Sequence, residues 1–285
     1  ELGETFTGNE LMLMPGGKGA NQAVQCSRLG LNVSMVGCVG NDIYGSELIN
    51  SLRENNVSVE NVNKRGTTTG IGIVQILESG DYCSTIIKGA NYLISEDDIT
   101  ESLFEGRPLV ILQSEIPAPV VEYIIGVAST HHCRIILNNA PARDVSAHAL
   151  SLVDYLVVNE TEAAFMSGAD VSSIDDAHSC ATGLHKRVKG QVIITLGEKG
   201  AVLSQEHGTR HFPAVFCPDV VDTTGAGDSF IGGIAYCIVN GFSLTDAIPF
   251  AAEISSCSIQ KYGGQNSFPM LPDVSHALKN SSLLD

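Results

Sequence analysis

Four short apolar segments in the second half of the chain, rich in β-branched residues, constrain the fold most strongly. They occupy residues 109–112 (LVIL), 134–137 (RIIL), 155–158 (YLVV) and 192–196 (VIITL). Amphipathic stretches accompany them at 119–130, 144–153, 160–167 and 175–189. Short buried strands that alternate with helices favour an α/β fold with helices on both faces of a mostly parallel sheet. In such a three-layer α/β/α architecture, ligands bind at the carboxyl ends of the strands.

The first 90 residues show a different pattern. Residues 5–14 (TFTGNELMLM) and 69–77 (TGIGIVQIL) alternate at about period two, and 75–87 predict a hairpin that turns at Ser79–Gly80. Between them, the pattern predicts a helix over 19–29, a strand over 33–38 and a helix over 45–55. We expect 1–14 and 66–89 to form a small β-sheet lid on a core of 15–65 and 90–285. The alternative is that the alternating strands are edge strands of the main sheet.

The charge and the cysteines limit the partners and the compartment. The chain has 32 acidic and 16 basic residues and a formal net charge of −16. This balance argues against nucleic acid and anionic membranes as partners. We find no run of 18 apolar residues and no basic-apolar leader, so we expect no membrane span. The eight cysteines are scattered without a C-x-x-C pair. We therefore expect reduced thiols in a cytoplasmic protein.

The stretch VVDTTGAGDSF (220–230) concentrates glycine and carboxylate at one junction. We expect Val220–Val221 to end a strand and a helix to begin near Asp228. Gly225 and Gly227 allow a ligand to approach the backbone closely, and the first turn of a helix attracts an anion. A carboxylate beside an anion site can accept the proton of an attacking hydroxyl in phosphoryl transfer. The alternative is a plain turn with Asp228 as a helix cap.

Three further stretches carry polar groups at predicted element ends. In 14–30 (MPGGKGANQAVQCSRLG), Lys18 and Asn21 can hold a hydroxylated ligand, or the stretch is simply a flexible entry to a helix. In 157–168 (VVNETEAAFMSG), the acids suit Mg²⁺ held through water, or they only cap a helix. In 194–203 (ITLGEKGAVL), a nucleotide can lie along the turn, or the stretch is a simple hairpin.

These stretches together resemble the ribokinase-like (PfkB) carbohydrate kinase family. GGKGANQA at 16–23 and DTTGAGDSFIGG at 222–233 are similar to its two signatures, and NETE at 159–162 to its Asn-x-x-Glu motif. The resemblance extends from about residue 2 to about residue 270. GANYLIS (89–95), LQSEIP (112–117) and NNAPAR (138–143) resemble the branch that phosphorylates ribose, although Asn139 replaces a proline of that branch.

The resemblance implies a role for each motif position. Asp228 is the catalytic base, with an anion hole formed by Gly225, Ala226 and Gly227. The sugar contacts are Gly17, Lys18, Gly19, Asn21, Glu115 and Asp228. ATP and hydrated Mg²⁺ are bound by Asn159, Glu162, Thr195, Gly197, Lys199, Gly200 and Gly227, with Glu162 reaching Mg²⁺ through water. A monovalent-cation loop, occupied by K⁺, contains Asp222, Thr224, Ser258, Lys261, Gly263 and Ser267.

The function expected from these features is ATP-dependent transfer of the γ-phosphoryl group to the primary hydroxyl of a free sugar, D-ribose first. A fructose-type sugar or a nucleoside such as adenosine is the alternative acceptor, and a non-catalytic sugar- or nucleotide-binding protein is the alternative class. The resemblance also implies a homodimer formed through the lid. Two positions depart from the family. The strand that carries its sugar-gripping Asn-x-Asp would precede Glu1, and Ala251–Ala252 stand where a His or Asn contacts adenine.

Overall fold

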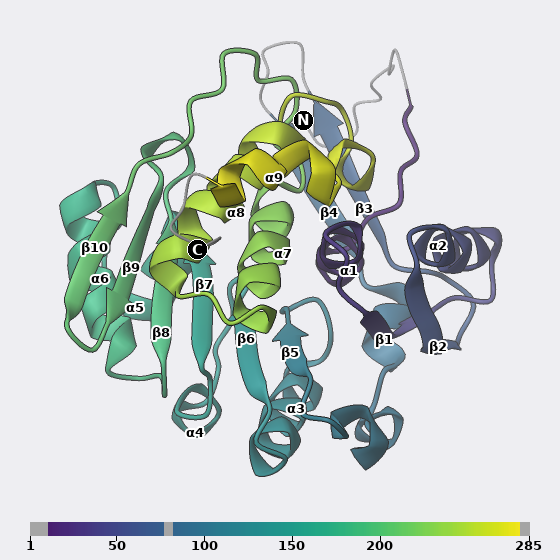
Figure 1. The fold of residues 1–285 in the computed structure, drawn as a ribbon. Helices are drawn as coiled ribbons and strands as arrows, with labels where there is room; N and C mark the ends of the chain where they lie inside the picture. Colours follow the sequence, from purple (N-terminus) through teal and green to yellow (C-terminus); the bar gives the residue numbers. More distant parts are fainter. Residues whose placement is uncertain (1–10, 77–81, 280–285) are drawn as a thin grey trace, which may run out of the picture.

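The computed structural model describes residues 11–76 and 82–279. It contains a central sheet of six strands, which Figure 1 shows with its helices. Its strand order is β10-β9-β8-β7-β6-β5. The strands are β5 (Leu109–Leu112), β6 (Arg134–Asn138), β7 (Tyr155–Asn159), β8 (Gln191–Thr195), β9 (Ala201–Gln205) and β10 (Gly208–Phe212). β5 to β8 run parallel, and β9 and β10 add antiparallel at one edge. The predicted mostly parallel sheet is therefore confirmed.

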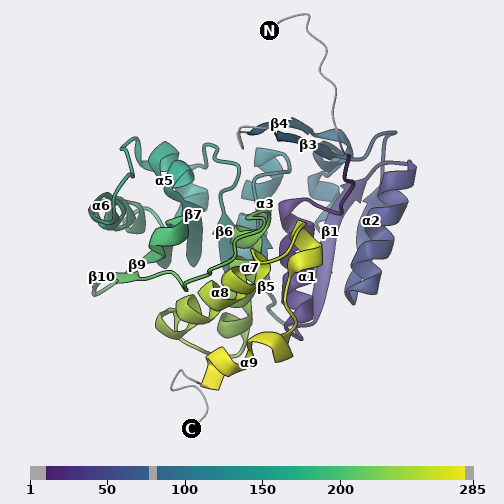
Figure 2. The ribbon, with the colours of Figure 1, turned by 90° about the horizontal axis from the view of Figure 1, so that it is seen from above.

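Helices cover both faces of this sheet, as Figure 2 shows from above. One layer contains α3 (Ala118–Thr130), α4 (Ala147–Leu150), α5 (Glu160–Ser167) and α6 (Ile174–His185). The other contains α1 (Lys18–Arg28), α7 (Ala226–Val239), α8 (Leu244–Ser258) and α9 (Leu271–Lys279). Along β6, Ile135 and Leu137 pack into the core of the first layer, and Ile136 packs into that of the second. Successive strand residues thus bury opposite faces, which explains the continuous apolar runs.

A second, two-stranded parallel sheet stands beside the main one. It pairs β1 (Val33–Val39) with β2 (Val57–Lys64), and α2 (Ile43–Glu54) packs on it. Within the described ranges, β1 has only β2 as a strand partner and β5 has only β6. Residues of β1 and β5 line a cavity of about 660 Å³ between the two sheets. The strand β1 was predicted, whereas β2 was not.

The segment 66–89, expected from the sequence to belong to a lid, contains an antiparallel strand pair that is separate from both other sheets. It consists of β3 (Ile71–Ile76) and β4 (Tyr82–Ile87), with Ile73 opposite Thr85 (Figure 2). The pairing confirms the predicted hairpin, although its turn at Ser79–Gly80 lies outside the described residues. Residues 1–10 of the expected N-terminal strand also lie outside them, and residues 11–14 form no strand.

The remaining elements are short 3₁₀ helices, and one predicted strand is absent. The 3₁₀ helices are η1 (Gly89–Leu93), η2 (Glu96–Asp98), η3 (Glu101–Phe104), η4 (Gly197–Lys199) and η5 (Gly264–Ser267).

The prediction of a strand that ends at Val220–Val221 was wrong. Both valines are exposed, and the N–H of Val221 bonds the carbonyl of Ile259 instead of a strand. Within the described part of the chain, every helix is too short or too polar to cross a membrane.

Candidate active site

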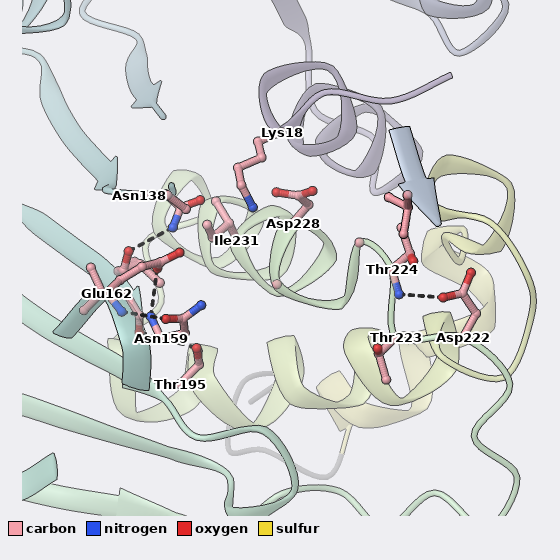
Figure 3. Close-up of a pocket in the computed structure, with 16 residues that line it drawn as sticks. Lys18, Asn138, Asn159, Glu162, Thr195, Asp222, Thr223, Thr224, Asp228 and Ile231 are labelled. Atoms are coloured by element: carbon pink, nitrogen blue, oxygen red, sulfur yellow. Dashed lines mark hydrogen bonds between the residues drawn. The ribbon is translucent and has the colours of Figure 1, made fainter. Parts of the chain in front are cut away.

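A cavity of about 570 Å³ lies where the parallel strands end (Figure 3). Asn138, Asn159 and Thr195, the last residues of β6, β7 and β8, line it together with the start of α7. Val74 of β3 also lines it, so this strand takes part in enclosing the space. The cavity therefore lies between the carboxyl edge of the sheet, where α/β folds bind ligands, and the β3–β4 pair.

The N-terminus of α7 presents main-chain donors to this cavity. Gly225, the N-cap, has a left-handed φ of 82°, which a side chain would strain. The N–H of Ala226 bonds the Thr223 carbonyl at 3.1 Å, whereas those of Gly227 and Asp228 have no acceptor in the described ranges. Gly227 lines the cavity, and a Cβ built on it would meet no atom within 4 Å. The helix start therefore offers free N–H groups and space for an anion.

Asp228 is the buried carboxylate of this helix start. Its side chain is only 6% exposed. Asn21 donates to Oδ2 at 2.8 Å, and Gln22 donates to Oδ1 at 2.9 Å. Burial raises the pKa of Asp228, while the charge of Lys18 and the two amide donors act to lower it. The result is a shielded carboxylate with lone pairs left to accept a proton, and Lys18 lies beside it in Figure 3.

A second carboxylate, that of Glu115, lies against the N-terminus of α1. Glu115 Oε2 accepts a hydrogen bond from the N–H of Lys18 at 2.8 Å. Burial raises the pKa of Glu115, against the lowering effect of that bond. Gly17, Gly19 and Glu115 line the 660 Å³ cavity, whereas Lys18 lines the 570 Å³ cavity. The expected sugar contacts thus lie where the two cavities approach each other, at the N-terminus of α1.

Asn159 and Glu162 form a capping box at the start of α5. Asn159 Oδ1 accepts from the N–H of Glu162 at 2.8 Å, and Glu162 Oε2 accepts from the N–H of Asn159 at 3.0 Å. Burial raises the pKa of Glu162. Both side chains line the cavity, and the Oε1 of Glu162 is not used by the cap. One carboxylate beside an open cavity fits Mg²⁺, which keeps several waters and also binds substrate phosphates.

The turn after β8 places its residues differently. Thr195 lines the cavity, but Gly197, Lys199 and Gly200 do not. Lys199 Nζ donates to the carbonyl of Ser172 at 2.9 Å. A Cβ at Gly200 would lie 2.0 Å from the carbonyl oxygen of Phe212, so packing alone requires glycine there. The turn itself is the predicted strand–turn–strand, formed by β8, η4 and β9.

The six residues of the expected cation loop are only partly brought together. Asp222 accepts from the N–H of Thr224 at 2.9 Å and from that of Gly263 at 3.0 Å. Burial opposes these bonds, but the pKa of Asp222 is lowered overall. Ser267 Oγ donates to the Gly264 carbonyl at 2.8 Å, and Lys261 is exposed. The Ser258 hydroxyl is buried in a cluster with Ser229 and Ser255 between α7 and α8, although the next residue, Ile259, accepts from the N–H of Asp222 at 3.2 Å.

Four polar residues of the site were missed by sequence reasoning: Gln22, Gln113, Asn138 and Gln265. Gln22 bonds Asp228 and Asn138, Gln113 bonds Gln22, and Gln265 bonds Asn21. The one available signal was the run of polar residues on a helix, since Asn21, Gln22 and Gln25 are all buried in α1. Their partners are 91 to 244 residues away in the chain, so the sequence pattern did not indicate them.

Known proteins resemble this chain over nearly its whole length. It is 36% identical to a ribokinase of Lactococcus lactis over 97% of this chain and 90% of that protein. It is 32% identical to a deoxyribokinase of Salmonella typhi over 94% of this chain and 89% of that protein. Among solved structures, Arabidopsis thaliana ribokinase complexed with ribose and ATP matches with a TM-score of 0.90 and 28% identity, covering 99% and 93% of the two chains.

The family model described as pfkB family carbohydrate kinase matches residues 2–271. This range contains the cavity, both glycine-rich segments and the capping box of α5. The match therefore agrees with the resemblance of the two signature stretches and with the α/β fold. The chain belongs to the pfkB family of carbohydrate kinases.

Proposed function

We propose that this carbohydrate kinase transfers the γ-phosphoryl group of ATP to the primary hydroxyl of D-ribose. The observation that carries the proposal is the position of Asp228, a buried carboxylate in the same helical turn as the free N–H of Gly227. A base and an anion site side by side suit an alcohol that attacks a phosphoryl group. The ribokinases among its relatives favour ribose as the acceptor.

In the proposed reaction, Asp228 accepts the proton of the sugar hydroxyl as its oxygen bonds the γ-phosphorus. The bond from that phosphorus to the bridging oxygen of ADP breaks, and ADP leaves. The N–H groups at the start of α7 stabilise the charge on the transferred group. Gly17, Gly19, Asn21 and Glu115 orient the sugar, and Thr195 contacts the nucleotide near the turn that contains Gly197, Lys199 and Gly200. Mg²⁺, when bound, neutralises phosphate charge, with Asn159 and Glu162 ordering its waters.

The direct test is an ADP-release assay with ribose, 2-deoxyribose, fructose and adenosine as acceptors. We expect the highest kcat/KM with ribose, because the relatives include ribokinases over nearly the full chain. A higher kcat/KM with another acceptor would mean that this acceptor, and not ribose, is the substrate. Calorimetric binding of sugar and nucleotide without ADP release would instead indicate a non-catalytic binding protein.

Glu162→Gln tests the proposed link to Mg²⁺. Glutamine keeps an oxygen that can accept from the N–H of Asn159, so α5 keeps its cap. It removes the negative charge, so the Mg²⁺ concentration for half-maximal activity should rise by about 10-fold or more, as when outer-shell metal partners are removed. Because burial raises the pKa of Glu162, ionisation opposes folding at neutral pH, and the variant should have at least the wild-type Tm.

The matched control is Asp176→Asn. Asp176 holds the same capping-box position in α6, bonded to Ser173, but it is only partly buried and does not line the cavity. This change should lower Tm slightly and leave the Mg²⁺ requirement unchanged. An equal Mg²⁺ shift in both variants would remove Glu162 from the proposed role and leave it as a helix cap.

For the loop after β10, we propose a K⁺ site whose candidate residues are Asp222, Thr224, Ser258, Lys261, Gly263 and Ser267. The support is the closed loop in which Asp222 holds the N–H groups of Thr224 and Gly263 directly before α7. A cation there would stiffen the helix start. Activity measured in KCl against tetramethylammonium chloride tests the proposal, and equal rates would contradict it.

We also propose that 1–14 and 66–89 form a lid on a core of 15–65 and 90–285, and that the lid pairs two copies. Strand alternation places Ile73 and Ile87 on the face opposite Val74, and both are exposed. Ile73→Asp should shift a dimer to monomer in sedimentation velocity, because it puts a charge into an apolar contact. Ile43→Asp, at an isoleucine on α2 that is more exposed than Ile73, is the control. Wild-type protein that sediments as a monomer would contradict the proposal.

A cytoplasmic location is proposed from the cysteines. Of the cysteines whose side chains the structure describes, seven are free thiols, and five of these are buried. Such thiols suit a reducing compartment.

A further inference from the structure

The side-chain amide of Gln22 is hydrogen-bonded through both its nitrogen and its oxygen inside the protein. The residue lies on α1 and is 1% exposed. Its Nε2 donates to Asp228 Oδ1 at 2.9 Å and to Asn138 Oδ1 at 3.1 Å. Its Oε1 accepts from Gln113 Nε2 at 2.6 Å. One side chain therefore connects α1, the end of β5, the end of β6 and the start of α7.

A backbone carbonyl fixes which end of each side-chain amide in this hydrogen-bonded series faces its neighbour. Asn138 Nδ2 donates to the carbonyl of Val157 at 3.0 Å, and a carbonyl can only accept. The Oδ1 of Asn138 must therefore face Gln22 and needs a donor. Gln22 consequently presents its NH₂ group toward both Asn138 and Asp228. A flipped Gln22 would place Oε1 against two acceptor oxygens, which the buried site disfavours.

The other oxygen of Asp228 is held in the same way. Asn21 Nδ2 donates to Oδ2, and Gln265 Nε2 donates to Asn21 Oδ1 at 3.0 Å. The charge of Lys18 on α1 lowers the pKa of Asp228, and the charge of Asp228 in turn raises the pKa of Glu115 after β5 and of Glu162 on α5. The amide donors therefore act with Lys18 against the effect of burial on Asp228.

We propose that Gln22 is a positioning residue that fixes the Asp228 carboxylate toward the acceptor hydroxyl and favours its ionised form, with Asn138 fixing the direction of the amide. This inference rests on the proposed role of Asp228 as the base. Because both N–H donors of Gln22 are used within the protein, it acts on the reaction through Asp228 and not by donating to the sugar. The signature stretch 16–23 thus supplies an orienting group for the base besides its expected sugar contacts.

Gln22→Met tests the inference, because methionine has a similar length and no donor. A base must be ionised, so activity is lost as pH falls through its pKa. Without the hydrogen bond from Gln22, the pKa of Asp228 should rise, so activity should be lost at a pH about one unit higher than in the wild type. The kcat at the plateau should fall about 10-fold, as for an impaired general base, with KM for ribose changed by less than about 3-fold since the sugar contacts remain.

Gln22→Glu gives an independent variant of nearly the same shape if the methionine variant does not fold. Its carboxylate would lie against Asp228, so the acid limb of the pH–activity profile, where activity falls with falling pH, should move to higher pH than in Gln22→Met. The Asp228 carboxyl carbon, identified by ¹³C NMR through its absence in Asp228→Asn, should show the same order of pKa values without any turnover. Equal NMR titration curves in wild type and both variants would overturn the inference.

Gln25→Met is the matched control. Gln25 is on the same helix and 0% exposed, but it donates to the Pro269 carbonyl and not to Asp228. It should leave the acid limb in place, and a shift equal to that of Gln22→Met would mean a general effect of repacking α1. A wild-type enzyme that releases no ADP with any acceptor defeats the proposed function, whereas an active one with unmoved limbs in both Gln22 variants defeats only this inference.

Discussion

Asp228→Asn should lower kcat by about 10² to 10⁴, the range typical of a lost general base. The amide cannot accept the hydroxyl proton, although it nearly matches the carboxylate in shape. The two carboxylates whose pKa the charge of Asp228 raises, Glu115 and Glu162, are engaged by main-chain N–H groups of Lys18 and Asn159. KM for the sugar should change little, because the effect falls on the transition state. Single-turnover ADP release measures the chemical step directly.

The same substitution should preserve the fold. Burial raises the pKa of Asp228 above its unfolded value, so its stabilising contribution is present below the unfolded pKa and is lost as pH rises. At neutral pH the ionised carboxylate therefore opposes folding. Asn removes that cost but turns an NH₂ toward Asn21 or Gln22, so we expect unfolding free energies within about 1 kcal/mol of wild type. A folded Asp228→Asn enzyme with wild-type turnover would exclude Asp228 as the base.

The main sheet was predictable because its strands bury both faces. The segments at 109–112, 134–137, 155–158 and 192–196 each match a strand to within one residue at either end. Such a strand is apolar at every position, and no partner needs to be known to recognise it. The capping box of Asn159 and Glu162 is similarly local, since its two bonds span three residues. Features of this kind can be predicted from one stretch of sequence, because the residues that determine them lie within that stretch.

The wrong and missing predictions concern segments whose structure depends on distant parts of the chain. Val220 and Val221 looked like a strand end, yet they are 57% and 41% exposed, because the chain there follows α8 and not the sheet. β2 was missed because five of its eight residues are polar and two polar residues in succession, Glu60 and Asn61, break the alternation. The amide chain through Gln22 depends on residues from four distant segments. Each of these outcomes is decided by tertiary contacts, which one sequence does not contain.

Gly225→Ala should impair both stability and catalysis, and Gly241→Ala is its matched control. The two glycines, at opposite ends of α7, share a φ of 82°. A left-handed backbone costs a residue with a Cβ about 1–2 kcal/mol. A Cβ at Gly241 would meet nothing within 4 Å, whereas one at Gly225 would lie 2.9 Å from the ring of Phe268. Gly241→Ala should therefore lose only the cost of strain.

Phe268 cannot yield easily, because it is 4% exposed and its carbonyl accepts from Arg28 Nη1 at 2.8 Å. Overpacking should add about 1–3 kcal/mol to the loss in Gly225→Ala. Relief of the clash would shift the N-cap, and with it the free N–H groups of Gly227 and Asp228. Displacing such donors should lower kcat by about 10² to 10³. Urea unfolding and ADP release measure the two effects, and equal losses of stability and activity in both variants would show that the start of α7 has no special role in binding the transferred phosphoryl group.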